Sequence, residues 1–429
     1  MMGSKVYKTL FGQTILMPQA NVEEFYKLND YFEHVTSNKF IDDLPHAYWS
    51  NILPQLKKTY ENNLLTLKEE GLPTKRSEQF NFANIHKLYD IDILSAESDN
   101  DSYDVIERFS YLNGKKRCIV LNDSRIFTSE DLNKRSPFNV QILDSVNTNK
   151  NRQSEYVKLL RQQDNFSKLT YALSPFPNVI IFPNGSNNTF DKNPVTVQYR
   201  NSCDEPRLEC NTTIFDVQYN AKVHLKEDVK TTAGQMNYSM YVLRENAELT
   251  IERTTNDYGG WNIFDSVFIC HPGSKLTVKF TNTGSQYTQE NLYIDSSSKT
   301  SVDIVGRNQI YKGNQYHQYV YQKSNDPDNY SCIDIKNVGR EYASTSFIGR
   351  YDVGPLSTNF NGTMNNQNLM LEKNVTMHTR PVLDIHTKEI KCQHGCTVSN
   401  INEDHMYYLQ TKGINKVTAS EMLIESFLC

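Results

Sequence analysis

Asn246–Ile251 reads NAELTI, and the same pattern returns in Asn220–Leu225 (NAKVHL), Gly273–Val278 (GSKLTV) and Lys299–Ile304 (KTSVDI). In each segment a turn-like pair of residues and one polar residue come before an apolar-polar-apolar run. The first apolar residue of that run recurs about every 26 residues, within the range expected for solenoids. The four residues that share this place are Val223, Leu249, Leu276 and Val302.

Stacked coils explain this period better than separate hairpins do. One repeat is too short to bury its own apolar face, whereas stacked repeats bury those residues in a continuous column. The sequence therefore predicts a mainly β protein built as a parallel β-helix. Further strands are expected at Cys332–Ile335, Ser346–Ile348, Leu369–Leu371 and Val382–Ile385. An antiparallel sandwich with regular strand spacing is the alternative that the pattern alone leaves open.

Before the repeats, the chain is predicted to be mainly helical. Gln55–Glu70 carries apolar residues at helical spacing, and Gly71 and Pro73 follow it as the usual signals for the end of a helix. A second helix is expected over Asn21–Val35. Strand-like sequence begins at Ile119–Ser129.

Three regions follow from these elements. Residues 1–110 form the expected N-terminal helical region, residues 111–398 the β-helix core, and residues 399–429 a short C-terminal helical region. Within the last region, helices are expected at Glu403–Thr411 and Val417–Leu428. Two helices of this size have little core of their own, so they must dock on another surface or cap the open end of the solenoid.

The composition is that of an ordinary globular protein. The chain has 429 residues and a formal net charge of -5, so nucleic acid is not an expected partner. No apolar run approaches the ~18 residues needed to cross a bilayer, and the N-terminal stretch resembles neither a secretory nor a transit signal. Eight cysteines in a chain of this length do not make a dense disulfide framework, which favours a reducing, cytoplasmic compartment.

The segment Lys391–Val398 (KCQHGCTV) carries potential metal ligands. In an extended strand alternate side chains share one face, so Cys392, His394 and Cys396 are expected side by side on that face. Thiolate and imidazole are ligands for soft and borderline metals, but the three residues complete no four-ligand zinc signature. The alternative is a buried strand in which the cysteines are small apolar fillers. His386 and His405 are weaker ligand candidates.

Three segments in the same order resemble the SufB/SufD family of iron-sulfur cluster assembly proteins. Arg380–Ile414, which contains KCQHGCTV, is similar to the C-terminal signature of that family, and only Gln393 and Cys396 depart from its central motif. Gly71–Phe82 (GLPTKRSEQFNF) resembles the N-terminal motif, and Asn365–Leu371 (NNQNLML) the asparagine-rich strand. The chain resembles SufD more than SufB, because a glycine follows the histidine and the asparagine-rich strand contains no cysteine.

The resemblance implies a right-handed parallel β-helix and a non-catalytic scaffold of the SUF system. It implies that the β-helix pairs with SufB, that the C-terminal helices bind the ATPase SufC, and that a transient iron or nascent iron-sulfur cluster gathers at the SufB interface. It assigns His394 as an iron-site ligand there, with Cys392 at a family cysteine beside it. Cys396 is not at a family ligand position, and is either an extra ligand or a packed thiol.

Several alternatives stay open at this stage. A SufB-like scaffold is the nearest, and a β-helical carbohydrate-active enzyme is the alternative from another class. The sequence carries no Gly-x-x-x-x-Gly-Lys-Ser/Thr loop, so ATP hydrolysis is expected in SufC and not in this chain. A homodimer that precedes the complex, and an organelle stroma in place of the bacterial cytoplasm, are both compatible with the sequence.

Overall fold

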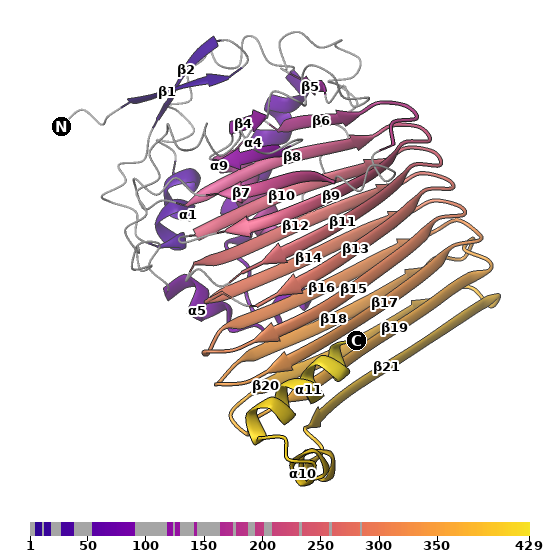
Figure 1. The fold of residues 1–429 in the computed structure, drawn as a ribbon. Helices are drawn as coiled ribbons and strands as arrows, with labels where there is room; N and C mark the ends of the chain where they lie inside the picture. The colour runs from indigo at the N-terminus through magenta and orange to yellow at the C-terminus, as the bar shows by residue number, and fades with distance from the viewer. Residues whose placement is uncertain are drawn as a thin grey trace.

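Figure 1 shows the computed structural model, in which parallel strands form one long stack with helices beside its N-terminal part and at its C-terminal end. The described residues are 5–10, 13–18, 27–37, 54–90, 118–122, 125–128, 141–143, 164–174, 177–187, 194–200, 208–230, 234–256, 260–283 and 285–429. The predicted border near residue 110 lies outside them.

The stack consists of two sheets, and from β6 onward successive strands alternate between them. The first sheet contains, in chain order, β5 (Gln141–Leu143), β6 (Asn178–Phe182), β8 (Glu209–Val217), β10 (Gly234–Leu243), β12 (Trp261–Cys270), β14 (Tyr287–Ser296), β16 (Gln315–Ser324), β18 (Ser344–Val353) and β20 (Thr376–Ile385). The second contains β3 (Cys118–Asn122), β4 (Arg125–Thr128), β7 (Val195–Arg200), β9 (Lys222–Lys230), β11 (Glu248–Thr255), β13 (Lys275–Asn282), β15 (Ser301–Ile310), β17 (Tyr330–Gly339), β19 (Phe360–Met370) and β21 (Ile390–Asn400).

The strand register confirms the predicted solenoid. Leu249 pairs with Val223 and with Leu276, and Leu276 pairs with Val302, so the residues that recur in the sequence form one column. All four are buried in one core cluster between the sheets. Every pair from β6 and β7 onward is parallel, which confirms the parallel β-helix and rules out the antiparallel sandwich.

The backbone conformation explains the turn-like pairs of residues in the repeat. Asn220, Asn246 and Lys299 have φ of 56°, 57° and 57°, and Gly273 has φ of 73°, so each coil turns through the left-handed region at the same place. Asparagine and glycine tolerate this region best. A Cβ on Gly273 would also collide with the Asn246 side chain of the preceding coil, so this coil needs glycine for both reasons.

Helices cover the outer face of the first sheet. The N-terminal elements are a hairpin of β1 (Lys5–Leu10) and β2 (Gln13–Pro18), helices α1 (Leu28–Thr36), α4 (Pro54–Glu70), α5 (Ile85–Asp90) and α9 (Asn165–Leu173), and a short 3-10 helix, η2 (Glu78–Phe80). A second core cluster joins α1, α4, α5 and α9 to outward-facing residues of the sheet. The predicted helix at 55–70 is confirmed by α4, whereas the one at 21–35 is described only from Leu28 onward.

Two helices follow the last strand. They are α10 (Glu403–Thr411) and α11 (Lys416–Leu428), close to the predicted ranges. Ile424 of α11 is buried with Val338 and Leu369, outward-facing residues of β17 and β19. The helix therefore docks on the outer face of the second sheet and does not cap the open end of the solenoid. Within the described residues no helix is long and apolar enough to span a membrane.

Candidate metal site on the last coil

The three predicted ligands lie on β21, the edge strand of the second sheet. Cys392, His394 and Cys396 pair with Gly362, Met364 and Asn366 of β19. Met364 is buried in the core between the sheets, and residues paired in a parallel sheet share a face. The three side chains therefore all face the solenoid interior.

The exposure of His394 follows from its place at the end of the stack. It continues a column of inward-facing apolar residues, namely Leu225, Ile251, Val278, Ile304, Ile333 and Met364. Those six residues are buried, because another coil covers each of them. His394 is exposed, since the described chain places no further coil on it. An imidazole thus takes the place at which the repeat pattern would put an apolar residue.

The two thiols are partly shielded. Cys392 is half-buried against the core cluster, and this burial raises the pKa of its thiol, which favours the protonated form. Cys396 is also half-buried. Between them, a Cβ on Gly395 would lie 3.1 Å from Asn365 Oδ1, so glycine leaves room for the asparagine side chain on the outer face.

The three side chains do not converge on one ion. Same-face residues of a strand are about 6.6 Å apart along it, too far for three ligands to share one ion within a straight strand. In the described chain the group that brings three potential ligand atoms within 4.8 Å is a different one, Asp352, Asp384 and His386. The β21 row is therefore an incomplete ligand set, and a metal bound there would need ligands beyond these three residues.

A ladder of buried amides supports β21 and was missed in the sequence. Asn308 donates to Asn337 at 2.9 Å, and Asn337 donates to Asn368 at 3.0 Å. Asn368 in turn donates to the Thr397 carbonyl of β21 at 3.1 Å. These side chains lie between the sheets. The asparagines are spaced 29 and 31 residues apart in the sequence, and this spacing could have indicated the ladder.

The N-terminal motif contacts the last coils from the outside. Glu78 Oε2 lies 2.9 Å from Arg350 Nη1 of β18, and Phe82 stacks on His378 of β20 with ring centroids 4.8 Å apart. The N-terminal family-like segment therefore contacts β18 and β20 near the end of the solenoid that carries β21.

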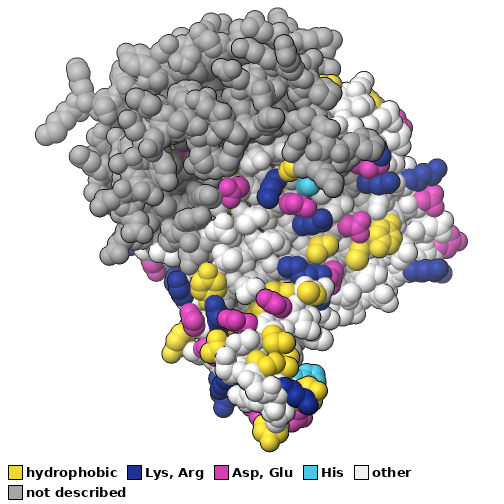
Figure 2. All heavy atoms as spheres, viewed as in Figure 1, with side chains coloured by type: hydrophobic (Ala, Val, Ile, Leu, Met, Phe, Trp, Pro, Cys, Tyr) yellow, Lys and Arg dark blue, Asp and Glu magenta, His cyan; other side chains and the backbone are white. Residues whose placement is uncertain are grey.

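The C-terminal helices expose apolar side chains. Figure 2 shows hydrophobic residues gathered on them at the bottom of the view. The most exposed are Tyr407, Val417, Tyr408 and Met422, at 70%, 69%, 60% and 44%. No residue of α10 is buried. Such a surface on a helix pair is typical of a binding site for another protein.

Fold and site together define a β-helical protein with potential metal ligands on its open last coil. Residues 199–427 match the family model described as the SufBD core domain of the SUF system for FeS cluster assembly. The chain belongs to this SufBD family of iron-sulfur cluster assembly proteins, as its three motifs indicated. The match favours the assembly class over the carbohydrate-active enzyme.

Curated relatives agree with this assignment. An iron-sulfur cluster assembly SufBD family protein of Synechocystis is 25% identical over 406 residues, which cover 86% of each chain. The iron-sulfur cluster assembly protein SufD of Escherichia coli is 33% identical over 92 residues, 21% of this chain and 22% of that protein. Protein ABCI7, chloroplastic, of Arabidopsis thaliana is 33% identical over 98 residues, 23% and 20% of the two chains. The last two matches thus span about a fifth of each protein.

Proposed function

We propose that this chain is a SufD-type, non-catalytic scaffold subunit of the SUF iron-sulfur cluster assembly complex. The observation that carries the proposal is the inward-facing row of Cys392, His394 and Cys396 on an uncovered last coil. A row of ligands that do not converge on one ion suits a site shared between two chains.

SufB is the proposed partner at this end. β20 and β21 are the terminal strands of their sheets, and their outer edges have no neighbouring strand among the described residues. Unpaired backbone N–H and C=O groups on a long edge favour pairing with another chain. A partner solenoid that pairs here would cover His394 and could bring its own ligands next to it.

Iron and sulfide are the proposed cargo at this interface. Neutral imidazole and thiolate both bind iron, and a partly filled protein ligand shell allows the nascent cluster to leave. We assign His394 as the ligand from this chain, because it is the exposed member of the row, with Cys392 beside it. Cys396 is an additional thiol that can contribute to the same shell.

SufC is the proposed partner of the exposed face of α10 and α11. This face carries exposed apolar side chains, and α11 is anchored to β19, the neighbour of β21, and to β17 beyond it in the same sheet. A movement imposed on the helices would therefore act close to the last coil. The proposal assigns ATP hydrolysis to SufC, and places the complex in the bacterial cytoplasm or an organelle stroma.

Anaerobic co-expression with SufB and SufC tests this function. His394→Ala should still form the complex with the wild-type mass, but should lose most of the bound iron and sulfide because the imidazole ligand is gone. Gln393→Ala is the matched control, since Gln393 lies on the same strand but faces outward and pairs with Thr363. Its iron and sulfide content should equal that of the wild type.

Two results would overturn the proposal. A wild-type chain that forms no complex with SufB and SufC would remove the scaffold role. A His394→Ala complex that keeps full iron and sulfide would remove the assignment of His394, while leaving the scaffold role in place.

A further inference from the structure

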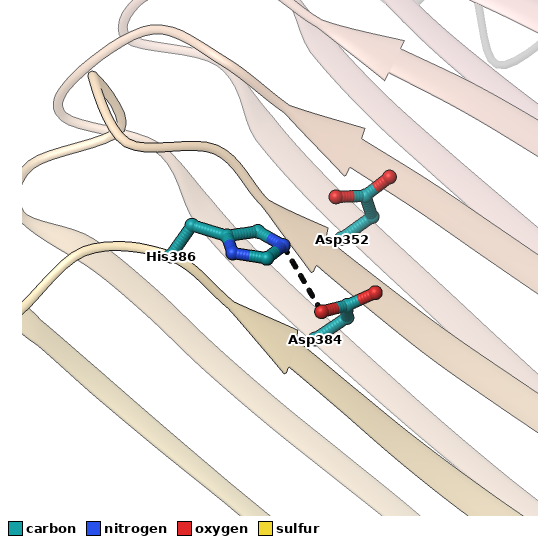
Figure 3. Close-up of side chains that lie close together, drawn as sticks. All are labelled: Asp352, Asp384 and His386. Atoms are coloured by element: carbon teal, nitrogen blue, oxygen red, sulfur yellow. Dashed lines mark ion pairs between the residues drawn. The ribbon is translucent and has the colours of Figure 1, made fainter.

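A second group of potential ligands lies on the outer face of the first sheet. Asp352 of β18 pairs in register with Asp384 of β20, and His386 follows β20 directly. One ligand atom from each lies within 4.8 Å of the other two, and His386 Nε2 lies 3.1 Å from Asp384 Oδ1 (Figure 3). The backbone N–H of His386 donates to the Val353 carbonyl at 2.8 Å, which fixes this residue beside β18.

Both carboxylates are oriented by donors from other positions in the sheet. Tyr321 of β16 donates to Asp352 Oδ2 at 2.5 Å. Arg350 of β18 donates to Asp384 Oδ2 at 3.1 Å. Each aspartate thus has one oxygen held by the protein and one oxygen available to the group, which is the arrangement that supporting residues give to metal ligands.

The local charge favours a cation. Arg350 contacts two carboxylates, Glu78 and Asp384, and Asp352 adds a third. Three carboxylates and one guanidinium leave two negative charges, in a partly exposed group in which the side chains of Glu78 and His386 are 27% and 57% exposed. Lys323 lies beside Asp352 in the register, but its side chain is exposed to water. A divalent ion would balance the remaining charge.

We propose that Asp352, Asp384 and His386 bind a first-row divalent metal ion such as Mn²⁺ or Fe²⁺. Two carboxylate oxygens and one imidazole nitrogen suit these ions and leave coordination positions for water. The set offers too few oxygens for Ca²⁺, and Mg²⁺ disfavours imidazole. The ion would join β18 to β20 in place of the direct contact between His386 and Asp384. This site faces away from the β21 row, because Tyr351, Val353, Leu383 and Ile385 occupy the inner face.

Mn²⁺ binding to the purified, metal-stripped chain tests the proposal by the loss of the free-ion signal in electron paramagnetic resonance. Mn²⁺ prefers oxygen and nitrogen ligands and avoids thiolates, so it separates this site from the cysteines of β21. His386→Gln and Asp352→Asn should each weaken binding at least about tenfold. Asp404→Asn, which changes an exposed residue on α10, should leave Mn²⁺ binding unchanged.

Thermal unfolding without metal shows whether each variant is folded before binding is compared. The proposed site would be wrong if folded His386→Gln and Asp352→Asn bound Mn²⁺ with the affinity of the wild type. It would also be wrong if the wild type bound no Mn²⁺. If an equal concentration of Mg²⁺ displaced Mn²⁺, the proposed preference for a first-row transition metal ion would be wrong. The test needs neither SufB nor SufC, so its failure leaves the proposed scaffold function untouched.

Discussion

The least expected residue of the interior is Arg253. Its guanidinium lies between the sheets, 2.7 Å from Glu227 Oε2 and 2.6 Å from Glu290 Oε2, and 4.6 Å from the centre of the Phe264 ring. The repeat pattern predicts that Arg253 faces inward, because it stands at an inward position of the repeat. Its partners come from strands 26 and 37 residues away, and a local pattern cannot assign them.

Replacement of Arg253 should strongly destabilise the folded protein. Arg253→Met leaves Glu227 and Glu290 buried without a cation, so the free energy of unfolding should fall by about 3–5 kcal/mol. Urea denaturation at pH 7 measures this change in the free energy of unfolding. Lys279→Met is the control, because Lys279 pairs with Glu252 on the surface and should cost less than about 1 kcal/mol. Equal losses in the two variants would mean that the buried triad contributes no more than a surface pair.

Glu290 should make stability depend on pH. Burial raises its pKa from the usual 4.5 to about 7, although Arg253 opposes the rise. The folded chain therefore keeps a proton that the unfolded chain has released, and this contribution to stability is lost as the pH rises from 4.5 to about 7. Glu290→Gln should flatten the plot of unfolding free energy against pH in that window. Parallel plots for the two proteins would contradict the assignment.

At the scale of elements, helices and strands were predictable where their pattern is local. The helices at 403–411 and 417–428 agree with α10 and α11 to within one residue, since spacing and end signals are both in the segment itself. The docking surface of α11 was not predictable. It depends on Val338 and Leu369, two outward-facing residues of a solenoid that otherwise shows polar residues there. The helix α9 also went unpredicted, within the region expected to be all β.

The docking of α11 can be tested separately from the solenoid. Ile424→Ala removes its main buried contact, so α10 and α11 should lose hydrogen-exchange protection while β9–β15 keep theirs. The docking free energy should fall by about 2 kcal/mol or more. Met422→Ala, on the exposed side of the same helix, serves as the comparison and should change neither region. An unchanged exchange rate in Ile424→Ala would show that the helix is held by other contacts.

At the scale of the whole molecule, the N-terminal helices and the solenoid share one core. Phe166 of α9 is buried against Phe80 at a centroid distance of 5.2 Å, and Tyr60 of α4 donates to the Ala172 carbonyl at 3.1 Å. The same cluster includes Met240 and Ile263 of the sheet. The repeat period predicted the solenoid, but nothing periodic indicates which sheet the helices cover.

This shared core predicts cooperative unfolding. Phe166→Ala should lower the free energy of unfolding by about 3–5 kcal/mol, and hydrogen exchange should accelerate together in α4, α9 and β10. Leu65→Ala is the matched control, since Leu65 is 56% exposed on α4 and should have little effect. Faster exchange confined to the helices would show that the solenoid is stable without them.

The two ends of the solenoid differ in what they offer to another chain. At the first coils the parallel run stops beside two short antiparallel strands, β4 with four residues and β5 with three. At the last coil it stops on β20 and β21, with ten and eleven residues. Short edge strands give an incoming strand little to pair with. Within the described chain only one end thus offers long pairing strands, so the pairing proposed above would stop at two solenoids instead of continuing into a filament.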